Sequence, residues 1–207
     1  MNFPWLETWK DATLIDRWCH DADMPTDKFG HTHGCVYVYR AGNIVMKRVD
    51  RRLDVNDHHR WLFKEFQILS QLSHPHIIKA YSYVLDVNDC VLYLEYGGEE
   101  YSTVRTSLTH DEKWRIYYQI EEAVRYLYGK GFSHRDLVAS NVVVNRQTLI
   151  AKLIDFQVCV RHFNHVLFEQ SIAYAGFGDQ PVSRVVHCCG KQPWQTLLDL
   201  RRDMGLT

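Results

Sequence analysis

Hydrophobic and polar positions recur with different periods along the chain, and each period predicts a different element. Apolar residues at helical spacing over residues 1–28 predict an N-terminal helical extension. Two β-rich runs, 36–39 and 44–46, are separated by the turn-forming Ala41-Gly42-Asn43 and predict a hairpin. Apolar positions three and four apart over residues 57–73 then predict a helix with one apolar face.

A second pair of strands and a long helix follow. Runs 81–85 and 91–94 complete a small antiparallel sheet, and the glycine pair at residues 97–98 marks a flexible joint after it. Thr109 and Glu112 have the spacing of a capping box and open a helix with an apolar stripe.

The remaining pattern predicts a hairpin and one more helix. Two β-branched runs, 142–144 and 149–154, predict the hairpin, and an apolar pattern that begins at Pro193 predicts a short helix. We therefore expect an α+β fold in three parts. They are the N-terminal extension, a sheet-rich lobe over residues 29–97 and a helical lobe over residues 98–207.

Composition narrows the class of protein. The chain has 207 residues, of which 46% are hydrophobic, enough for one sizeable core that two lobes can share. Its formal net charge is −1 with both signs mixed, so we expect no nucleic-acid partner. No window reaches the roughly 18 apolar residues that span a bilayer. The N-terminus also lacks the basic head and apolar run of a Sec signal.

Cysteines and histidines do not form a recognisable metal site in the sequence. The six cysteines include no Cys-x-x-Cys pair, which favours reduced structural thiols in a reducing cytoplasm. None of the twelve histidines shows the helical pairing with a carboxylate that metalloproteases use. We therefore expect no zinc-type cluster.

Three polar residues on either side of the predicted hairpin at 142–154 have the spacing of a phosphoryl-transfer site. Asp136 follows His134-Arg135, Asn141 comes five positions later, and Asp155 follows the second β-branched run. Such a site uses one carboxylate to accept the proton of the acceptor hydroxyl. It uses an amide and a second carboxylate to hold Mg²⁺ on the nucleotide phosphates.

Upstream residues supply possible partners for this site. Lys47 ends the second predicted strand, and Glu65 lies along the edge of the apolar face of the next helix. The two can form an ion pair that positions the lysine on nucleotide phosphates. Gly30 and Gly34 bracket a short loop whose backbone can approach phosphates, although a plain β-turn explains that loop equally well.

Taken together, these strings resemble the motifs of protein kinases. IVMK resembles the kinase V-A-I-K motif, HRDLVASN the H-R-D-L-x-x-x-N catalytic loop, and IDFQ stands where D-F-G belongs. KEFQILSQLSHPHIIKAY is similar to the kinase αC helix and the strand after it, and LYLEYGG to the fifth strand and hinge. The resemblance implies a bilobal kinase-like fold with a truncated helical C-lobe.

The resemblance also implies roles for individual residues, with ATP and Mg²⁺ as cofactors. Lys47 would bind phosphates, Glu65 would orient Lys47, and Asp136 would be the catalytic base. Asn141 and Asp155 would bind Mg²⁺. The nucleotide would be covered by the loop and strand start at Gly30, Gly34 and Val36, with Leu94 as gatekeeper and Glu95 to Gly97 contacting the adenine.

Several positions depart from the family pattern. His31 stands where the loop has its second glycine, and Gln157 replaces the D-F-G glycine, which predicts that Asp155 is held in one state. Val138 and Ser140 leave the acceptor residue undecided between serine/threonine and tyrosine. About fifty residues follow Asp155 without an A-P-E string, so we expect no regulatory activation segment.

This compactness resembles the HopBF family of bacterial secreted effector kinases. That resemblance implies a monomeric protein kinase, secreted into a host cytoplasm, that phosphorylates serine in the host ninety-kilodalton heat-shock chaperone. Without secretion we expect a cytoplasmic protein.

Two other interpretations stay open. The residues also suit a lipopolysaccharide-sugar or small-molecule kinase, or a nucleotide-binding pseudokinase that acts as a binding module. The tryptophan-rich extension either packs on the main body or docks a partner.

Overall fold

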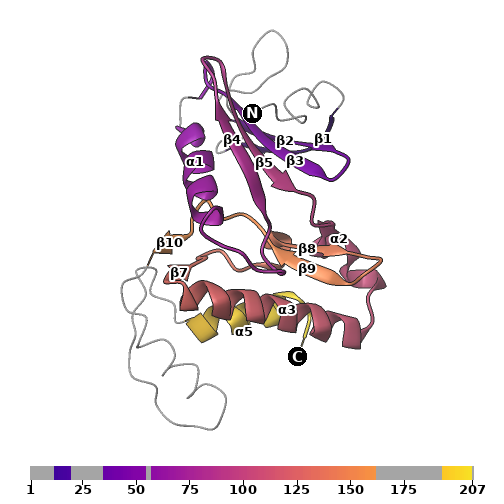
Figure 1. Cartoon of the computed structure of the whole chain (residues 1–207). Coiled ribbons are helices and arrows are strands. Elements are labelled where there is room, and N and C mark those ends of the chain that lie inside the picture. The colour runs from indigo at the N-terminus through magenta and orange to yellow at the C-terminus, as the bar shows by residue number, and fades with distance from the viewer. Residues whose placement is uncertain (1–11, 20–34, 55–56, 162–192, 207) are drawn as a thin grey trace. The chain divides into compact units, whose positions relative to one another are not determined.

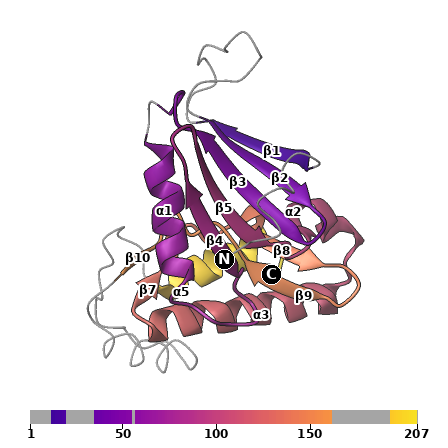
Figure 2. The same cartoon turned by 45° about the horizontal axis from the view of Figure 1, so that its top comes forward.

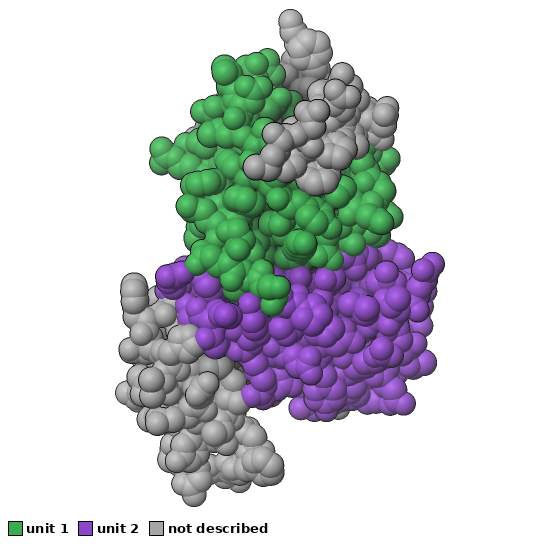
Figure 3. Space-filling model, viewed as in Figure 1, with its two compact units in different colours: residues 1–73, 78–96 green, residues 74–77, 97–207 purple. Residues whose placement is uncertain are grey.

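The structure is a computed structural model that describes residues 12–19, 35–54, 57–161 and 193–206 (Figure 1). It divides into two compact units, coloured separately in Figure 3. The first unit comprises residues 1–73 and 78–96, and the second comprises residues 74–77 and 97–207. The mixture of an antiparallel sheet with helices confirms the predicted α+β class. Within the described ranges, no helix is long and apolar enough to cross a membrane.

The first unit is built on a five-stranded antiparallel sheet (Figure 2). Its strand order is β1-β2-β3-β5-β4, so β3 lies at the centre. The strands are β1 (Thr13–Cys19), β2 (Cys35–Ala41), β3 (Ile44–Asp50), β4 (Ala80–Leu85) and β5 (Asp89–Glu95). The predicted hairpin is the β2–β3 pair, whose turn has Gly42 at φ 58°, a conformation that glycine adopts without cost.

One helix, α1 (His58–Leu69), packs on β3, β4 and β5 of this sheet. Leu62 of the helix and Met46 and Leu92 of the strands are almost fully buried and form the core between the two layers. The helix begins where Asp54 accepts hydrogen bonds from the backbone N–H groups of His58 and His59. Burial opposes ionisation of Asp54, but the hydrogen bonds from both histidines outweigh it and hold the pKa of Asp54 well below its usual range.

The predicted helical extension is wrong for Thr13–Cys19. These residues form β1, which pairs antiparallel with β2 at the edge of the sheet, with an irregularity between Leu14 and Asp16. The spacing of apolar residues suited a helix, but the unpaired edge of β2 offers a row of backbone partners that an isolated amphipathic segment does not have. The rest of the predicted extension, 1–11 and 20–28, lies outside the described residues.

The described residues of the second unit combine small sheets with three helices. The helices are α2 (Tyr101–Val104), α3 (His110–Gly129) and α5 (Pro193–Asp203), with the 3₁₀ turns η2 (Arg105–Ser107) and η3 (Ala139–Asn141). β6 (Glu99–Glu100), β8 (Val142–Asn145) and β9 (Ile150–Leu153) form one antiparallel sheet, and β7 (Phe132–Ser133) pairs with β10 (Val160–Arg161). The β8–β9 pair is the predicted second hairpin.

The helix predictions in this unit are confirmed. Thr109 caps α3 in a capping box with Glu112, in which the two residues satisfy each other's backbone N–H groups. One face of α3 is buried, with Ile116, Ile120 and Val124 at its centre. The predicted short helix that begins at Pro193 is α5.

Gly98 provides a stability test of the joint before β6. Its φ is 129°, and an added Cβ would lie 2.2 Å from the backbone carbonyl atoms of Val144. We expect Gly98→Ala to lower the free energy of unfolding by at least about 2 kcal/mol, measured by urea unfolding. Gly129→Ala is the matched control, because an added Cβ there meets nothing within 4 Å. Equal effects of the two substitutions would contradict the steric explanation.

Candidate active site

The first unit contains a buried ion pair on its central strand. The Nζ atom of Lys47 on β3 lies 2.9 Å from both carboxylate oxygens of Glu65 on α1. Glu65 is fully buried, whereas the side chain of Lys47 keeps 15% of its surface exposed. The predicted pairing is therefore present, but the predicted place of Glu65 at the edge of the apolar face is wrong. The ammonium group lets this carboxylate lie inside the core.

The segment proposed for adenine contact is held by backbone hydrogen bonds within the first unit. The N–H of Glu95 donates to the carbonyl of Lys79 at 2.9 Å, and that of Tyr96 donates to Asn43 at 2.8 Å. The Glu95 side chain in turn accepts the N–H of Lys79. These N–H groups are thus engaged, so we expect an adenine contact here to use carbonyl oxygens and Gly97.

Other predicted nucleotide contacts are only partly described. Val36 on β2 and Leu94 on β5 are both buried in the first unit. Gly30 and Gly34, and with them the predicted phosphate loop, lie outside the described residues. So does His31, the departure from the family pattern within that loop.

In the second unit, His134 supports the loop that carries Asp136. Its Nε2–H donates to the carbonyl of Ile154 at 2.8 Å, and its Nδ1 faces the N–H of Asp136 at 3.4 Å. This arrangement fits a neutral ring with the proton on Nε2. Burial lowers the pKa of His134 and outweighs the nearby carboxylates and hydrogen bonds, which act in the opposite direction. The ring also packs edge-on against Phe156.

Asp136 and Asn141 are in direct contact. The amide Nδ2 of Asn141 donates to the backbone carbonyl of Asp136 at 2.9 Å and to its Oδ2 at 2.8 Å. Asp136 is exposed, whereas Asn141 is buried in η3. The carboxylate is therefore accessible to an acceptor group, and the nitrogen of the Asn141 amide is used for positioning, which leaves its oxygen to ligate a cation.

Asp155 follows β9 and is held next to the same loop. The N–H of the preceding Ile154 donates to the carbonyl of Asn141 at 2.9 Å. Asp155 has φ 64°, in the left-handed region that few residues other than glycine occupy. Such strain is typical of functional positions.

Gln157 has a role that the sequence did not reveal. Its Nε2 donates to Oδ2 of Asp155 at 3.2 Å. The sequence showed only the loss of a glycine at this position. The contact depends on the backbone conformation of residues 155–157, which includes φ 64° at Asp155. The hydrogen bond agrees with the expectation that Asp155 is held in one state.

An amide oxygen and a carboxylate are hard ligands suited to a divalent cation. Across the described ranges there is no cluster of three or more His, Cys, Asp or Glu side chains that could hold a metal by itself. A cation bound at Asn141 and Asp155 would therefore need further ligands from phosphate or water. This is how nucleotide-bound Mg²⁺ is usually held.

The chain matches a known protein family over most of its length. The family model described as "Protein kinase domain" matches residues 26–174. This chain belongs to the protein kinase family. The match contains every position assigned above to phosphate, metal or proton handling, in the order that the kinase motifs require.

Individual kinases resemble the chain over parts of their length. It is 35% identical over 101 residues to "Maternal embryonic leucine zipper kinase" of Xenopus tropicalis, which covers 47% of this chain and 15% of that protein. It is 32% identical over 124 residues to "Aurora/IPL1-related protein kinase 2" of Caenorhabditis elegans, covering 58% and 38%. It is 31% identical over 132 residues to "SNF1-like protein kinase ssp2" of Schizosaccharomyces pombe, covering 62% and 23%. The matched segments thus span less than two fifths of each of these relatives.

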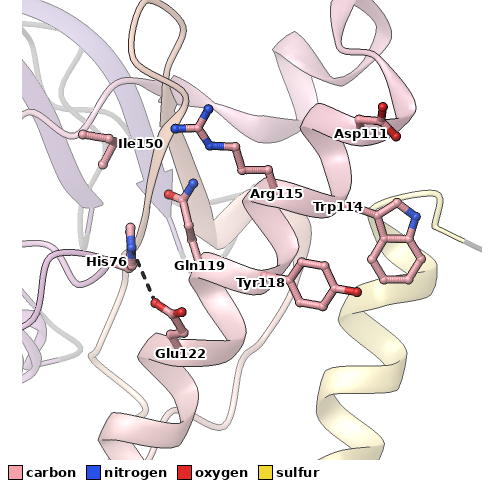
Figure 4. Close-up of a pocket in the computed structure, with 8 residues that line it drawn as sticks. All are labelled: His76, Asp111, Trp114, Arg115, Tyr118, Gln119, Glu122 and Ile150. Atoms are coloured by element: carbon pink, nitrogen blue, oxygen red, sulfur yellow. Dashed lines mark ion pairs between the residues drawn. The ribbon is translucent and has the colours of Figure 1, made fainter.

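A pocket of about 800 Å³ lies elsewhere in the second unit, along α3 (Figure 4). None of the residues assigned above lines it. Figure 4 shows the Trp114 and Tyr118 rings on one side and Arg115, Gln119 and the ion pair between His76 and Glu122 on the other. Mixed charge on an open surface does not define a class of ligand, so we assign no binding or catalytic function to this pocket.

The buried ion pair predicts a separation of stability from activity. We expect Lys47→Met to lower the free energy of unfolding by about 3 kcal/mol, because the buried Glu65 carboxylate loses its ammonium partner. Adding Glu65→Leu should recover most of this stability without restoring activity. Urea unfolding and phosphate transfer would be measured in parallel.

The control for the ion-pair test is Arg48→Met on the same strand. It removes a partly exposed pair with Asp89, for which we expect a loss below about 1 kcal/mol. A double variant as unstable as Lys47→Met alone would contradict the electrostatic explanation.

The low pKa of His134 predicts acid sensitivity. The unfolded chain binds a proton on this histidine below its ordinary pKa of 6.5, whereas the folded chain resists protonation. Stability from this group is therefore complete above pH 6.5 and is lost as the pH falls below it. The free energy of unfolding of the wild type should therefore rise with pH between pH 5 and 6.5. In His134→Gln we expect this dependence on pH to be weaker by up to about 1.4 kcal/mol per pH unit, measured by urea unfolding between pH 5 and 7.5. An unchanged slope would contradict this assignment.

Proposed function

We propose that this chain is an ATP- and Mg²⁺-dependent kinase that phosphorylates serine or threonine side chains of other proteins. The observation that carries the proposal is the contact between Asp136 and Asn141 in a chain that matches the protein kinase domain. A positioned, accessible carboxylate beside an amide that can ligate a cation is what phosphoryl transfer requires.

In the proposed reaction, each of the four polar residues has its own role in the transfer of the γ-phosphate. The acceptor hydroxyl oxygen attacks the γ-phosphorus of ATP, the bond from that phosphorus to the bridging oxygen breaks, and ADP leaves. Asp136 accepts the hydroxyl proton, and Lys47 neutralises charge on the phosphates. Asn141 and Asp155 would hold Mg²⁺, which when bound neutralises charge on the phosphate oxygens. Such a site works mainly by positioning and electrostatics.

Each unit contains part of the residue set that the kinase motifs require. Lys47 belongs to the first unit, and Asp136, Asn141 and Asp155 belong to the second. Retention of a fully buried Glu65 paired with Lys47 supports an active kinase over a binding module, since a buried charge is costly without a partner. A chain released from catalysis has no reason to keep it.

The narrower proposal concerns the substrate. On the resemblance to HopBF effectors, we propose a bacterial protein that acts as a monomer in a host cytoplasm on the ninety-kilodalton heat-shock chaperone. The exposed Val138 and Ser140 of the catalytic loop do not select the acceptor residue, so this proposal rests on the resemblance alone. Incubation with the purified chaperone, followed by mapping of phosphorylated residues, tests it directly. Absence of chaperone phosphorylation by an otherwise active kinase would refute it.

The kinase proposal is tested with labelled ATP, Mg²⁺ and a eukaryotic lysate. We expect label on discrete protein bands, and a loss of at least about 100-fold in Asp136→Ala and Asp155→Ala, because each removes a charge used in the transition state. Chelation with EDTA should abolish transfer and added Mg²⁺ should restore it. Asp111→Ala, an exposed acid at the start of α3, should leave transfer unchanged.

The same experiment separates the alternatives. Label in a sugar or lipid fraction alone would favour a small-molecule kinase. Thermal stabilisation by ATP without any transfer would favour a pseudokinase. For an active kinase we expect Asp136→Asn to keep the stabilisation by ATP and Mg²⁺, and Asp155→Asn to lose its Mg²⁺-dependent part.

A further inference from the structure

The helix α5 is firmly anchored within the second unit. It runs alongside α3 in both views of the ribbon (Figures 1 and 2). Leu200, Met204 and Leu206 are almost completely buried. The guanidinium of Arg201 lies 4.6 Å from the centre of the Trp114 ring, a favourable cation–π distance. α5 is therefore a fixed support for whatever contacts it.

The end of α5 has a defined geometry as well. Gly205 adopts φ 74°, and its N–H donates to the carbonyl of Arg202 while the N–H of Leu206 donates to that of Arg201. This is the Schellman pattern of helix termination. The hydroxyl of the buried Tyr101 on α2 donates to the carbonyl of Met204 at 2.9 Å. Asp203, the last residue of α5, is thus held by the helix before it and by this cap after it.

Asp203 contacts the loop between the two catalytic residues. Its Oδ2 accepts the N–H of Ala139 at 2.6 Å, across 64 positions of sequence. Ala139 is buried and is the first residue of η3. The first N–H groups of a helical turn have no acceptor within it, so this bond satisfies a buried donor that the loop itself cannot satisfy.

The contact is connected to the catalytic carboxylate by further hydrogen bonds. The N–H of Asn141 donates to the carbonyl of Val138, which closes the short turn around Ala139. Asn141 then holds Asp136 through its amide. Fixing the N–H of Ala139 therefore restricts the whole turn from Asp136 to Asn141.

We propose that Asp203 is a positioning residue for phosphoryl transfer, which braces the catalytic loop through the backbone of Ala139. This inference rests on the proposed kinase function. Asp203 touches neither nucleotide nor acceptor in this proposal. It acts by keeping Asp136 and Asn141 in their productive arrangement, because small displacements of catalytic groups cost much of the rate.

The test compares two substitutions at one position. Asp203→Ala removes the acceptor, and we expect kcat to fall about tenfold while KM for ATP changes by less than about twofold. Asp203→Asn keeps an oxygen acceptor and should restore most of kcat. Arg202→Ala, whose side chain is 78% exposed on the same turn, is the matched control and should behave as wild type. All values are taken per folded molecule, with the folded fraction measured by circular dichroism.

A second measurement does not depend on activity. Hydrogen exchange of the amides from Leu137 to Asn141 should be about tenfold faster in Asp203→Ala than in wild type or Asp203→Asn.

Ala139→Pro removes the donor instead of the acceptor. Val138 already has the extended conformation (φ −130°, ψ 159°) that precedes proline, and proline suits the first position of a helical turn. Combined with Asp203→Ala it should lower kcat no further than either change alone.

The outcomes separate the inference from the function on which it rests. A wild-type protein without phosphate transfer refutes the kinase proposal. An active wild type with unchanged kcat and unchanged exchange in Asp203→Ala refutes the bracing role. A variant that is only less stable, with normal kcat per folded molecule, also refutes it. Equal defects in Asp203→Asn and Asp203→Ala would show that charge, and not the acceptor, is what matters.

Discussion

The hydrogen bonds of Asn141 determine the geometry of the catalytic loop. Its side-chain amide holds the backbone and the carboxylate of Asp136, and its backbone carbonyl accepts the N–H of Ile154, next to Asp155. One buried residue thus sets the position of both carboxylates of the site. A buried amide must satisfy its donors. A shift of Asp136 or Ile154 would therefore also move Asn141 and, through it, the other partner.

In the first unit, the corresponding constraint is the partial burial of a lysine side chain, which requires a partner of opposite charge. Lys47 lies on the central strand of the sheet, and Glu65 reaches it from the helix that packs on that sheet. Neither charge is stable alone in this environment, but together they form a preorganised pair. The side chain of Lys47 keeps some exposure, which it needs in order to contact a ligand.

Strain and support occur together in the second unit. Arg135 and Asp155 both occupy the left-handed region of backbone space. Arg135 precedes Asp136 in the chain, and Asp155 follows Ile154, whose N–H donates to the carbonyl of Asn141. The buried, neutral ring of His134 forms hydrogen bonds with the carbonyl of Ile154, next to Asp155, and with the N–H of Asp136, next to Arg135. Gln157 and Asp203 add polar contacts to the same region, from the next turn and from a distant helix. Such reinforcement is what allows unfavourable conformations to persist.

The motifs that carry the chemistry are contiguous in sequence, so the sequence alone predicted the kinase family, the two hairpins, the capped helix and the Lys47–Glu65 pair. Local spacing and turn chemistry are sufficient for the hairpins and the capped helix. The family and the Lys47–Glu65 pair follow from the kinase pattern that the strings resemble. It failed where the outcome depended on partners far away in the chain. β1 is a strand because the edge of β2 is available to it, Glu65 is buried because Lys47 neutralises it, and Asp203 meets Ala139 because α5 packs beneath the loop. Only tertiary structure decides such contacts, since no local pattern encodes which distant donor or charge will be nearby.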